Sequence, residues 1–442
     1  MKLTLIILNT WHFNTKNDWY GFSSRGGYAP SAMRVLASLI PQDLDVEVEF
    51  RDENIERINF ESIQADLVGI SVLTANAPRA YQVSDDFRKR GIKVVLGGYH
   101  VTALPEEAIQ HADSVVVGFA ERSFPILLRD FVSGNLKKFY NQNHETAFLT
   151  DQRLVNNPGN YRKQYLLPDT LEITRGCYNN CSFCVIPSMC GNYVKRPVAL
   201  VVEEIKFLKS AKLVFLDFSP FEDFDYAIEL FEAIKPLKIK WYSSMTTKNA
   251  ENEAFLEKAA GSGCSGVLIG FETINPGILN SVNKKFNHPE QYLRIVSNLH
   301  KHQIWVLGSF IFGFDEDDKQ VFKTTLDFNR HSKIDMLHYA ILTPFPGTRL
   351  FEQLKSENRI STFDWSKYDG THVVFQPAKM TADELQQGFF EVYRKSHSLA
   401  AIAGRTFQSP SNMAVKLAAN LGFRLYIHSF IKQYRREKDN IH

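Results

Sequence analysis

Short runs of consecutive apolar residues, each followed by a stretch of helical periodicity, recur along most of the chain and limit its fold more than any other feature. In the first 135 residues these runs begin at Lys2, Val46, Leu67, Ile92 and Ser114. They are rich in Val, Ile and Leu without regular polar alternation, which is typical of parallel strands covered on both faces. The pattern predicts an α/β domain over residues 1–135, built on a doubly wound parallel sheet.

The same alternation resumes after a polar segment. Residues 136–167 are rich in Asn, Gln and Pro and are predicted to form a linker. Further strand-like runs begin at Thr170, Lys212, Ile239, Gly266, Trp305 and Met336. Strands joined by helical crossovers favour a partial (β/α)6 barrel over residues 168–360, with its chemistry on the loops that follow the strands. Residues 361–442 are predicted to form a C-terminal helical extension.

The charge balance and the cysteine content favour a small-molecule enzyme of the cytoplasm. Lys and Arg number 51 against 49 Asp and Glu, so no global field points to nucleic acid as a partner. No apolar run approaches the roughly 20 residues of a membrane span, and the apolar start is shorter than a signal sequence. Five cysteines in 442 residues, three of them within eight positions, suit a metal site in a reducing compartment.

The run TRGCYNNCSFCVIP places Cys177, Cys181 and Cys184 in a C-x-x-x-C-x-x-C spacing directly after a predicted strand. A structural zinc site has four closed ligands, usually in two pairs, and the bacterial ferredoxin run has two-residue gaps with a fourth cysteine. Three thiolates on a four-iron cluster leave one iron without a protein ligand, and that iron can bind the amino and carboxylate groups of a substrate. A zinc loop completed by Cys190 or a histidine is the alternative.

This spacing resembles that of the radical S-adenosylmethionine (SAM) superfamily. The resemblance implies a 4Fe-4S cluster that donates an electron to SAM, and an adenosyl radical that abstracts a hydrogen atom. SFIFGFDE resembles the family's adenine-contacting strand, and GFETINPGILNSVNKK and LTPFPGTRLFEQL match two later segments. The SAM-binding residues implied in this way are Phe183, Asp217, Ser244, Glu272, Ile311, Gly313 and Glu316.

Three positions depart from the pattern of that family. Phe218 follows Asp217, where many relatives carry a second acid for the methionine amino group. Ser309 replaces the usual first glycine of the adenine-contacting strand. On the third barrel strand, Ser244 or Thr246 stands near a position often held by glutamine, and either is a candidate for the ribose contact.

Three loops at the carboxyl edge of the N-terminal sheet resemble the cobalamin-contacting loops of domains fused to radical enzymes. They are SVLTAN, GGYHVTALPEE and GFAE. Two glycines at a strand end let a flat, bulky ligand approach the backbone, and no G-x-G-x-x-G or P-loop motif supports a nucleotide instead. The residues implied for cobalamin are Ser71, Thr74, Gly97, Gly98, Tyr99, His100, Gly118 and Glu121. A domain that has lost cobalamin is the alternative.

The motif D-x-H-x-x-G, which supplies a histidine below cobalt in other cobalamin proteins, is absent because Gly98 stands two residues before His100. Cobalt is therefore expected without a lower histidine, and His100 is alternatively a satisfied loop histidine. The C-terminal segment is similar to the extension in the branch that includes hopanoid-modifying enzymes. That extension is expected to pack over the barrel mouth, with Trp365, Tyr368 and Phe375 lining the substrate pocket.

The resemblance implies methylation of an unactivated carbon in a small molecule or lipid. Two-electron methyl transfer cannot reach a carbon that has neither a lone pair nor acidity, so a radical must first remove hydrogen. Radical cyclisation or ring rearrangement with the same cofactors is one alternative, and a non-enzymatic cobalamin or redox sensor is another. An external flavodoxin- or ferredoxin-type electron donor is expected. The basic, amphipathic end of the chain suggests peripheral membrane contact if the substrate is a lipid.

Overall fold

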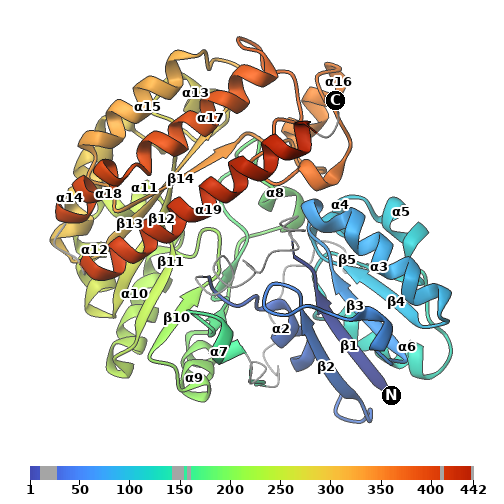
Figure 1. Ribbon diagram of the computed structural model, residues 1–442. Helices are drawn as coiled ribbons and strands as arrows, with labels where there is room; N and C mark the ends of the chain where they lie inside the picture. The colour runs from blue at the N-terminus through green and yellow to red at the C-terminus, as the bar shows by residue number, and fades with distance from the viewer. Residues whose placement is uncertain (10–26, 142–153, 157–160, 409–412, 440–442) are drawn as a thin grey trace.

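The computed structural model describes residues 1–9, 27–141, 154–156, 161–408 and 413–439 (Figure 1). Two parallel sheets of six strands form its two halves. The first half contains the N-terminus, and the second half carries the C-terminal helices on its outer side. Both the predicted α/β domain and the predicted barrel are therefore confirmed.

The first sheet has the strand order β2-β1-β3-β4-β5-β6, with all neighbours parallel. The strands are β1 (Lys2–Ile7), β2 (Glu47–Asp52), β3 (Leu67–Ser71), β4 (Lys93–Gly97), β5 (Ser114–Val117) and β6 (Phe139–Asn141). The connections reverse direction between β1 and β3, which is where ligands bind in open sheets of this kind. Strand β6 lies in the segment predicted as a linker and pairs with β5.

Helices cover both faces of this sheet, as the unbroken apolar strands require. One face packs against α2 (Ala32–Ser38) and α6 (Ser123–Val132). The other face packs against α3 (Ala77–Lys89), α4 (Tyr99–Ala103) and α5 (Pro105–Ala108). The free space of this domain therefore lies at the carboxyl edge of its strands.

The second sheet follows the chain in the order β7-β10-β11-β12-β13-β14, again all parallel. Its strands are β7 (Thr170–Leu171), β10 (Lys212–Phe215), β11 (Lys240–Ser244), β12 (Cys264–Glu272), β13 (Trp305–Phe312) and β14 (Met336–Ile341). The outer helices are α9 (Val198–Leu208), α10 (Phe224–Ile234), α11 (Thr247–Glu251), α12 (Glu253–Gly261), α13 (Pro276–Ser281), α14 (Tyr292–Lys301), α15 (Gln320–His331) and α16 (Arg349–Ser356). Fully buried aromatic side chains, including Trp241, Phe271 and Phe310, fill the space between this layer and the sheet.

The first predicted barrel strand, TLEITRG, is divided in the structure. Strand β7 ends at Leu171, and β8 (Thr174–Arg175) pairs antiparallel with β9 (Val194–Lys195) in a small separate sheet. The carboxylate of Asp217 accepts the backbone N–H groups of Ile173 and Thr174, which replaces a neighbouring strand as their partner. The short helices α7 (Tyr161–Gln164) and α8 (Ile186–Met189) lie on either side of this region in sequence.

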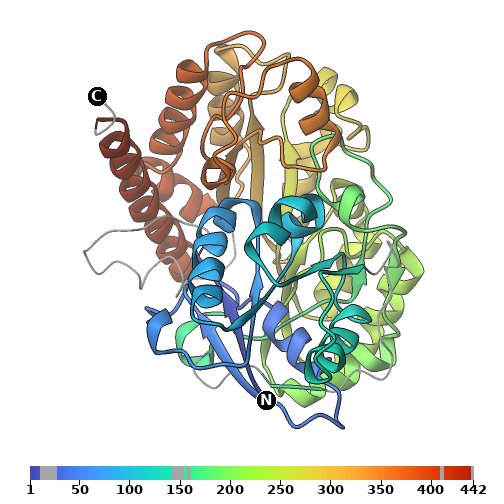
Figure 2. The ribbon, with the colours of Figure 1, turned by 90° about the vertical axis from the view of Figure 1, so that its right-hand side faces the viewer.

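The C-terminal helices lie along the outside of the barrel, whereas the sequence suggested a cover over its mouth (Figures 1 and 2). They are α17 (Ala382–Ser396), α18 (Leu399–Gln408) and α19 (Met413–Asp439). The Tyr393 hydroxyl donates to the Tyr339 carbonyl at 2.7 Å and accepts its N–H at 2.9 Å, which fixes α17 at the free edge of β14. Within the described parts of the chain, no helix combines the length and apolar character that crossing a bilayer requires.

Candidate active site

The three cysteines of the predicted cluster motif lie on one loop that follows β8. Gly176 opens the loop with φ +84°, and a Cβ there would lie 2.9 Å from the Asn192 carbonyl oxygen, so a side chain does not fit. The backbone and side-chain N–H groups of Asn179 both donate to Cys177 Sγ at 3.3 Å. Cys177 Sγ thus accepts two N–H hydrogen bonds, as a metal-bound thiolate does.

Burial raises the pKa of all three thiols, and that of Cys181 reaches about 12. Cys184 and Cys177 each raise the pKa of Cys181 through their charge, so the three sulfurs lie close together. Among the described residues, no three His, Cys, Asp or Glu side chains converge as ligands of one metal ion. Buried thiols of this kind are stabilised as thiolates by a metal centre, so the loop fits a cluster bound at several corners.

Cys190, one of the residues predicted as an alternative fourth ligand of a zinc loop, lies behind the loop. Its side chain is buried beside Arg175, and it accepts a hydrogen bond from the Gly176 backbone. Burial raises its pKa to about 11. Cys264, the remaining cysteine, is buried at the start of β12.

A second segment, residues 282–284, wraps the cysteine loop and brings a charge to it. Ser182 N–H donates to the Val282 carbonyl, and the Asn283 side chain donates to the Asn180 carbonyl at 2.9 Å. The ammonium group of Lys284 forms a buried ion pair with Glu272, which ends β12 in the left-handed region at φ +61°. Burial alone would lower the pKa of Lys284, but Glu272 and then Cys181 outweigh burial and raise it.

An acid that the sequence analysis did not single out reaches the first cysteine. Glu222 accepts from the Asn179 side chain at 2.7 Å, and its Oε1 lies 3.6 Å from Cys177 Sγ. Ser219 Oγ also donates to Glu222. The signal was present in the sequence, because the acid stands on the same post-strand loop as Asp217.

The structure gives Asp217 a structural task at the base of the cysteine loop. Besides the two backbone N–H groups, its carboxylate accepts the Thr174 hydroxyl at 2.8 Å, and burial raises its pKa to about 7. Ser244 donates to the Asp217 carbonyl and faces the barrel interior, whereas Thr246 is the N-cap of α11 and accepts from Asn249 N–H. Of the two ribose candidates, Ser244 is the one directed toward the site.

The predicted adenine-contacting strand is β13, and Ile311 is half-buried near its end. Gly313 adopts φ +107°, and a Cβ there would meet Leu385 at 2.9 Å. Glu316, predicted as a contact, is exposed at the surface. The acid that turns inward is Asp317, which accepts the N–H groups of Gly313 and Phe314. Phe183, also predicted for SAM, packs edge-on against the ring of Phe314.

The three loops predicted for cobalamin meet at one edge of the first sheet. Gly98 has φ +104°, and a Cβ there would lie 2.7 Å from the Val72 carbonyl oxygen. Nothing lies within 4 Å of the Cβ position of Gly118. Thr74 Oγ1 and Glu121 Oε2 are buried oxygens without hydrogen-bond partners among the described residues. One open glycine and two unsatisfied oxygens at one edge suit a bulky ligand that carries amide groups. Ser71 and Gly97 end β3 and β4 at the same edge.

Two further predicted cobalamin residues contact the rest of the chain instead. The Tyr99 hydroxyl donates to the Pro346 carbonyl, which ties α4 to the loop after β14. His100 is 0% exposed, and its Nε2 faces Glu107 Oε1 at 3.4 Å. Trp365 packs on the same ring and donates to Glu107 at 2.9 Å. The enclosed imidazole supports the loop from beneath and does not line the edge of the sheet.

Trp365 belongs to the part of the C-terminal segment that touches the first domain. Tyr368 packs edge-on against Trp365 and is fully buried. Phe375, the third aromatic predicted to line the pocket, is also fully buried. These side chains fill space between elements, as aromatics commonly do.

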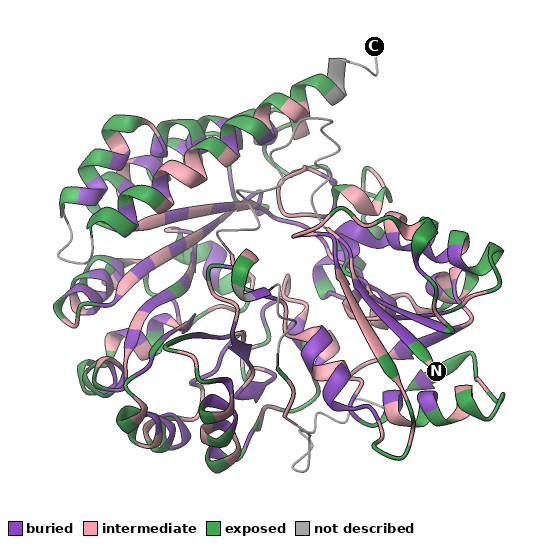
Figure 3. Cartoon of the chain, turned by 60° about the horizontal axis from the view of Figure 1, so that its bottom comes forward, coloured by how far each residue is buried: buried purple, intermediate pink, exposed green. Residues whose placement is uncertain are grey.

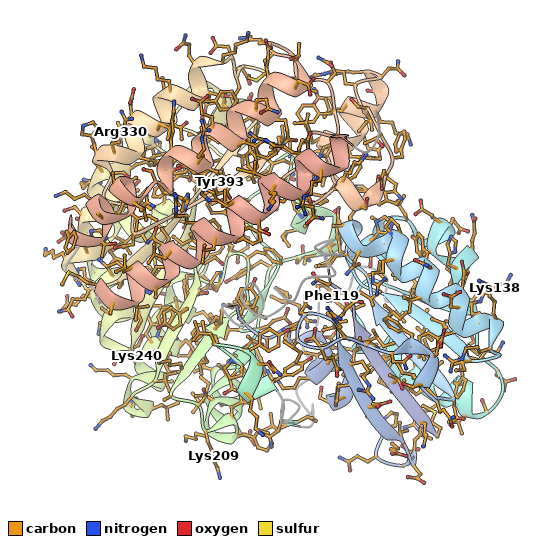
Figure 4. The ribbon with its side chains drawn as sticks, in the orientation of Figure 1. Phe119, Lys138, Lys209, Lys240, Arg330 and Tyr393 are labelled. Carbon is orange, nitrogen blue, oxygen red and sulfur yellow. The ribbon has the colours of Figure 1, made fainter. Side chains whose placement is uncertain are left out.

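Arg175 joins the two halves directly before the cysteine loop. Its guanidinium lies 4.3 Å from the ring centroid of Phe119, which Figure 4 shows on the flank of the first domain that faces the barrel. It pairs with Glu121 at 2.5 Å and with Glu172 at 2.7 Å, and the side chains of Arg175 and Glu121 are only 6% and 3% exposed. One cation therefore connects the GFAE loop to the cluster motif, a contact that the sequence analysis missed.

The inner face of the second sheet is only partly filled. Along β13 and β14 every second residue is buried against the outer helices, and the residues between them keep intermediate exposure (Figure 3). Strand register arranges the inward side chains in rows. The lowest row is Tyr242, Gly266 and Trp305; the next is Ser244, Leu268, Leu307 and Met336; the third is Gly270, Ser309 and His338. Leu268, in the middle of β12, is 40% exposed, so the interior presents apolar surface that other described side chains leave uncovered.

The family model of the Radical SAM superfamily matches residues 171–328, and that of the B12 binding domain matches residues 21–128. The bacteriochlorophyllide d C-12(1)-methyltransferase of Chlorobaculum tepidum is 34% identical over 400 residues, which cover 87% of this chain and 86% of that protein. This chain belongs to the cobalamin-dependent radical SAM methyltransferase family.

Two further comparisons agree with this membership. The bacteriochlorophyllide d C-8(2)-methyltransferase of the same organism is 30% identical over 92% of this chain and 93% of that protein. The methyltransferase TsrM from Kitasatospora setae, solved with cobalamin and a 4Fe-4S cluster bound, has a TM-score of 0.64 and 17% identity over 80% of this chain and 75% of that one. At 17% identity, this comparison shows that the present chain has the same fold as TsrM.

Proposed function

We propose that this radical SAM methyltransferase adds a methyl group to an unactivated carbon at the periphery of a chlorin, a flat and apolar tetrapyrrole. The observation that carries the proposal is the open, apolar inner face of the barrel, where Leu268, Leu307 and Met336 keep exposure that a packed barrel would remove. Two relatives that cover most of the chain act, by name, on a bacteriochlorophyllide. In this proposal the planar ring system lies against the rows of this face.

The proposed roles follow the geometry. Cys177, Cys181 and Cys184 would hold the 4Fe-4S cluster, and the loops around Gly98 and Gly118 would hold cobalamin. When bound, the cluster and SAM supply a hydrogen-abstracting radical, and cobalamin supplies the methyl group. Arg175 would keep the cobalamin loop and the cluster loop in a fixed relation, because its charge is neutralised from both sides. Burial of these groups excludes water from the space between the loops.

The partners proposed for this activity are an external flavodoxin- or ferredoxin-type electron donor and the substrate itself. A cytoplasmic location is part of the proposal, and the free thiols of all five cysteines support it. An apolar substrate also favours contact with a membrane surface. Exposed apolar side chains on α18 and α19, among them Phe407, Val415 and Leu425, support such a contact.

The test is anaerobic reconstitution with iron, sulfide and cobalamin, followed by incubation with SAM, a reductant and bacteriochlorophyllide d. The expected products are 5′-deoxyadenosine, S-adenosylhomocysteine and a chlorin heavier by one methylene group. Formation of 5′-deoxyadenosine with an unmethylated, altered chlorin would instead indicate cyclisation or rearrangement. Methylation of a hopanoid but not of the chlorin would overturn the proposed substrate class.

A further inference from the structure

An imidazole lies on the inner face of the barrel, at the middle of β14. The exposure pattern of this strand alternates, with Met336, His338 and Ala340 half-buried and the residues between them buried. His338 therefore faces the interior. In the sheet register it stands opposite Ser309, which in turn stands opposite Gly270. The mechanism proposed above assigns no role to this histidine.

One ring nitrogen of His338 is already engaged, and the other is available. Nδ1 lies 3.1 Å from Ser309 Oγ. Within the described residues Nε2 makes no hydrogen bond and is not sealed from solvent, so it opens onto the interior. Burial lowers the pKa of the imidazole to about 4, so the ring is neutral at physiological pH. A neutral imidazole whose Nδ1–H is held by an oxygen acceptor presents a lone pair on Nε2.

We propose that His338 binds the central magnesium ion of the chlorin through Nε2, with Ser309 as the positioning residue that fixes the ring. This inference rests on the proposed substrate class. Magnesium held by the ring nitrogens of a chlorin accepts a further ligand on one face of the macrocycle. The apolar neighbours Leu307 and Met336 limit the water that would otherwise take this place.

The position of His338 explains why such a substrate would react at its edge. Gly270, two strands away in the same row, is covered by the carboxylate of Glu272 and the ammonium group of Lys284. Two strand spacings separate the backbones of His338 and Gly270 by about 10 Å. A chlorin centred on His338 therefore directs its periphery, and not its metal, toward Lys284 and the cysteine loop.

The experiment compares two chlorins on the reconstituted holoenzyme, before any turnover. Bacteriochlorophyllide d and the same chlorin without magnesium are titrated separately, and affinity and the visible absorption bands are recorded. The wild type is expected to bind the magnesium chlorin at least about 10-fold more tightly and to shift its bands to the position that the same chlorin shows with imidazole as its axial ligand in free solution. His338→Ala should lose both the preference and the shift, and added imidazole should restore the shift.

Two further variants test the role of Ser309. Ser309→Ala should keep the shift but weaken binding of the magnesium chlorin by about 10-fold, because the imidazole loses its orienting partner. His331→Ala, which removes an exposed histidine at the end of α15, is the matched control and should bind both chlorins as the wild type does. Circular dichroism confirms that each variant is folded.

The outcomes separate the two proposals. Equal binding of both chlorins by the wild type, or an unchanged preference in His338→Ala, overturns the role of His338 and leaves the substrate class standing. Failure of the wild type to bind either chlorin overturns both proposals.

Discussion

The two six-stranded sheets begin from the same pattern of apolar strands and helical connections, yet they offer ligands different surfaces. In the first sheet, consecutive residues of β3 and β4 are buried, because helices cover both faces. In the second sheet, only the outer face is covered, and the inner face of β13 and β14 keeps its alternation. A sheet covered on both faces binds at its edge, whereas a curved sheet covered on one face can bind within it. The four experiments below test this division of tasks.

The largest effect is expected at the cysteine loop of the second sheet. Cys181→Ala should abolish the cluster, because the loop provides only three thiolates and the cluster needs all of them. Iron and sulfide analysis after anaerobic reconstitution measures the loss, and Cys190→Ala is the matched control that should retain both. Equal loss of metal in the two variants would show that Cys190 is a ligand and that the loop holds a different centre.

The junction between the sheets depends on Arg175. Arg175→Ala leaves Glu121 and Glu172 without their cation at a buried position and should lower the free energy of unfolding by about 3–5 kcal/mol. Denaturant titration measures the change. Arg330→Ala removes an exposed ion pair with Asp327 and should cost less than about 1 kcal/mol. A similar small cost in both variants would mean that the two sheets are held together elsewhere.

Burial of His397 on the outer face of the second sheet should make the free energy of unfolding depend on pH. His397 is enclosed between α17 and α19, and burial, followed by Arg405, lowers its pKa to about 3. The unfolded chain takes up this proton near pH 6.5, whereas the folded chain does not, so stability falls as the pH drops from 6.5 toward 3. Between pH 7 and pH 4 the loss attributable to His397 is about 3 kcal/mol.

Stability curves of the wild type and His397→Gln at several pH values measure this contribution. The variant should lose less stability on acidification. Parallel pH profiles for the two proteins would contradict a neutral, enclosed His397.

The smallest effect concerns the edge of the first sheet. Gly98→Ala forces a side chain into φ +104° and into contact with the Val72 backbone, which should cost about 1–3 kcal/mol and weaken cobalamin binding. Gly404→Ala lies in α18 with open space around its Cβ and should stabilise by about 0.5–1 kcal/mol. Thermal unfolding and cobalamin absorbance measure both variants. Unchanged cobalamin binding in Gly98→Ala would place the ligand away from this edge.

Features carried by local patterns could be predicted from the sequence. Runs of Val, Ile and Leu determine where parallel strands form. Cys177, Cys181 and Cys184 are so close in sequence that a single loop holds all three. The division of the first barrel strand could not be predicted, because it depends on Asp217, more than forty positions downstream. The position of the C-terminal helices depends likewise on a contact between Tyr393 and Tyr339.

The site residues show the same limit. Phe183 and Glu272 could be predicted as site residues because they stand beside recognisable motifs, and their roles in binding SAM stay predictions. Lys284, Glu222 and Arg175 stand in or beside recognised motifs, but they act through partners that only the folded chain brings near. The inward turn of Asp317, next to Glu316, could not be predicted because a one-residue difference after a strand decides which side chain points inward.

The two end strands of the second sheet have a consequence for how the barrel is completed. Strands β7 and β14 stand at opposite ends of the strand order and do not pair with each other in the part of the chain that is described. A closed ring of eight strands leaves a bore only wide enough for side chains. A ring left unjoined exposes backbone groups along its two end strands, and other parts of this chain satisfy some of them: the Tyr393 hydroxyl bonds Tyr339 in β14, and the Arg34 guanidinium donates to the Thr170 carbonyl in β7. Side chains of α17 and α2, and not a further strand, therefore complete the two ends of the barrel.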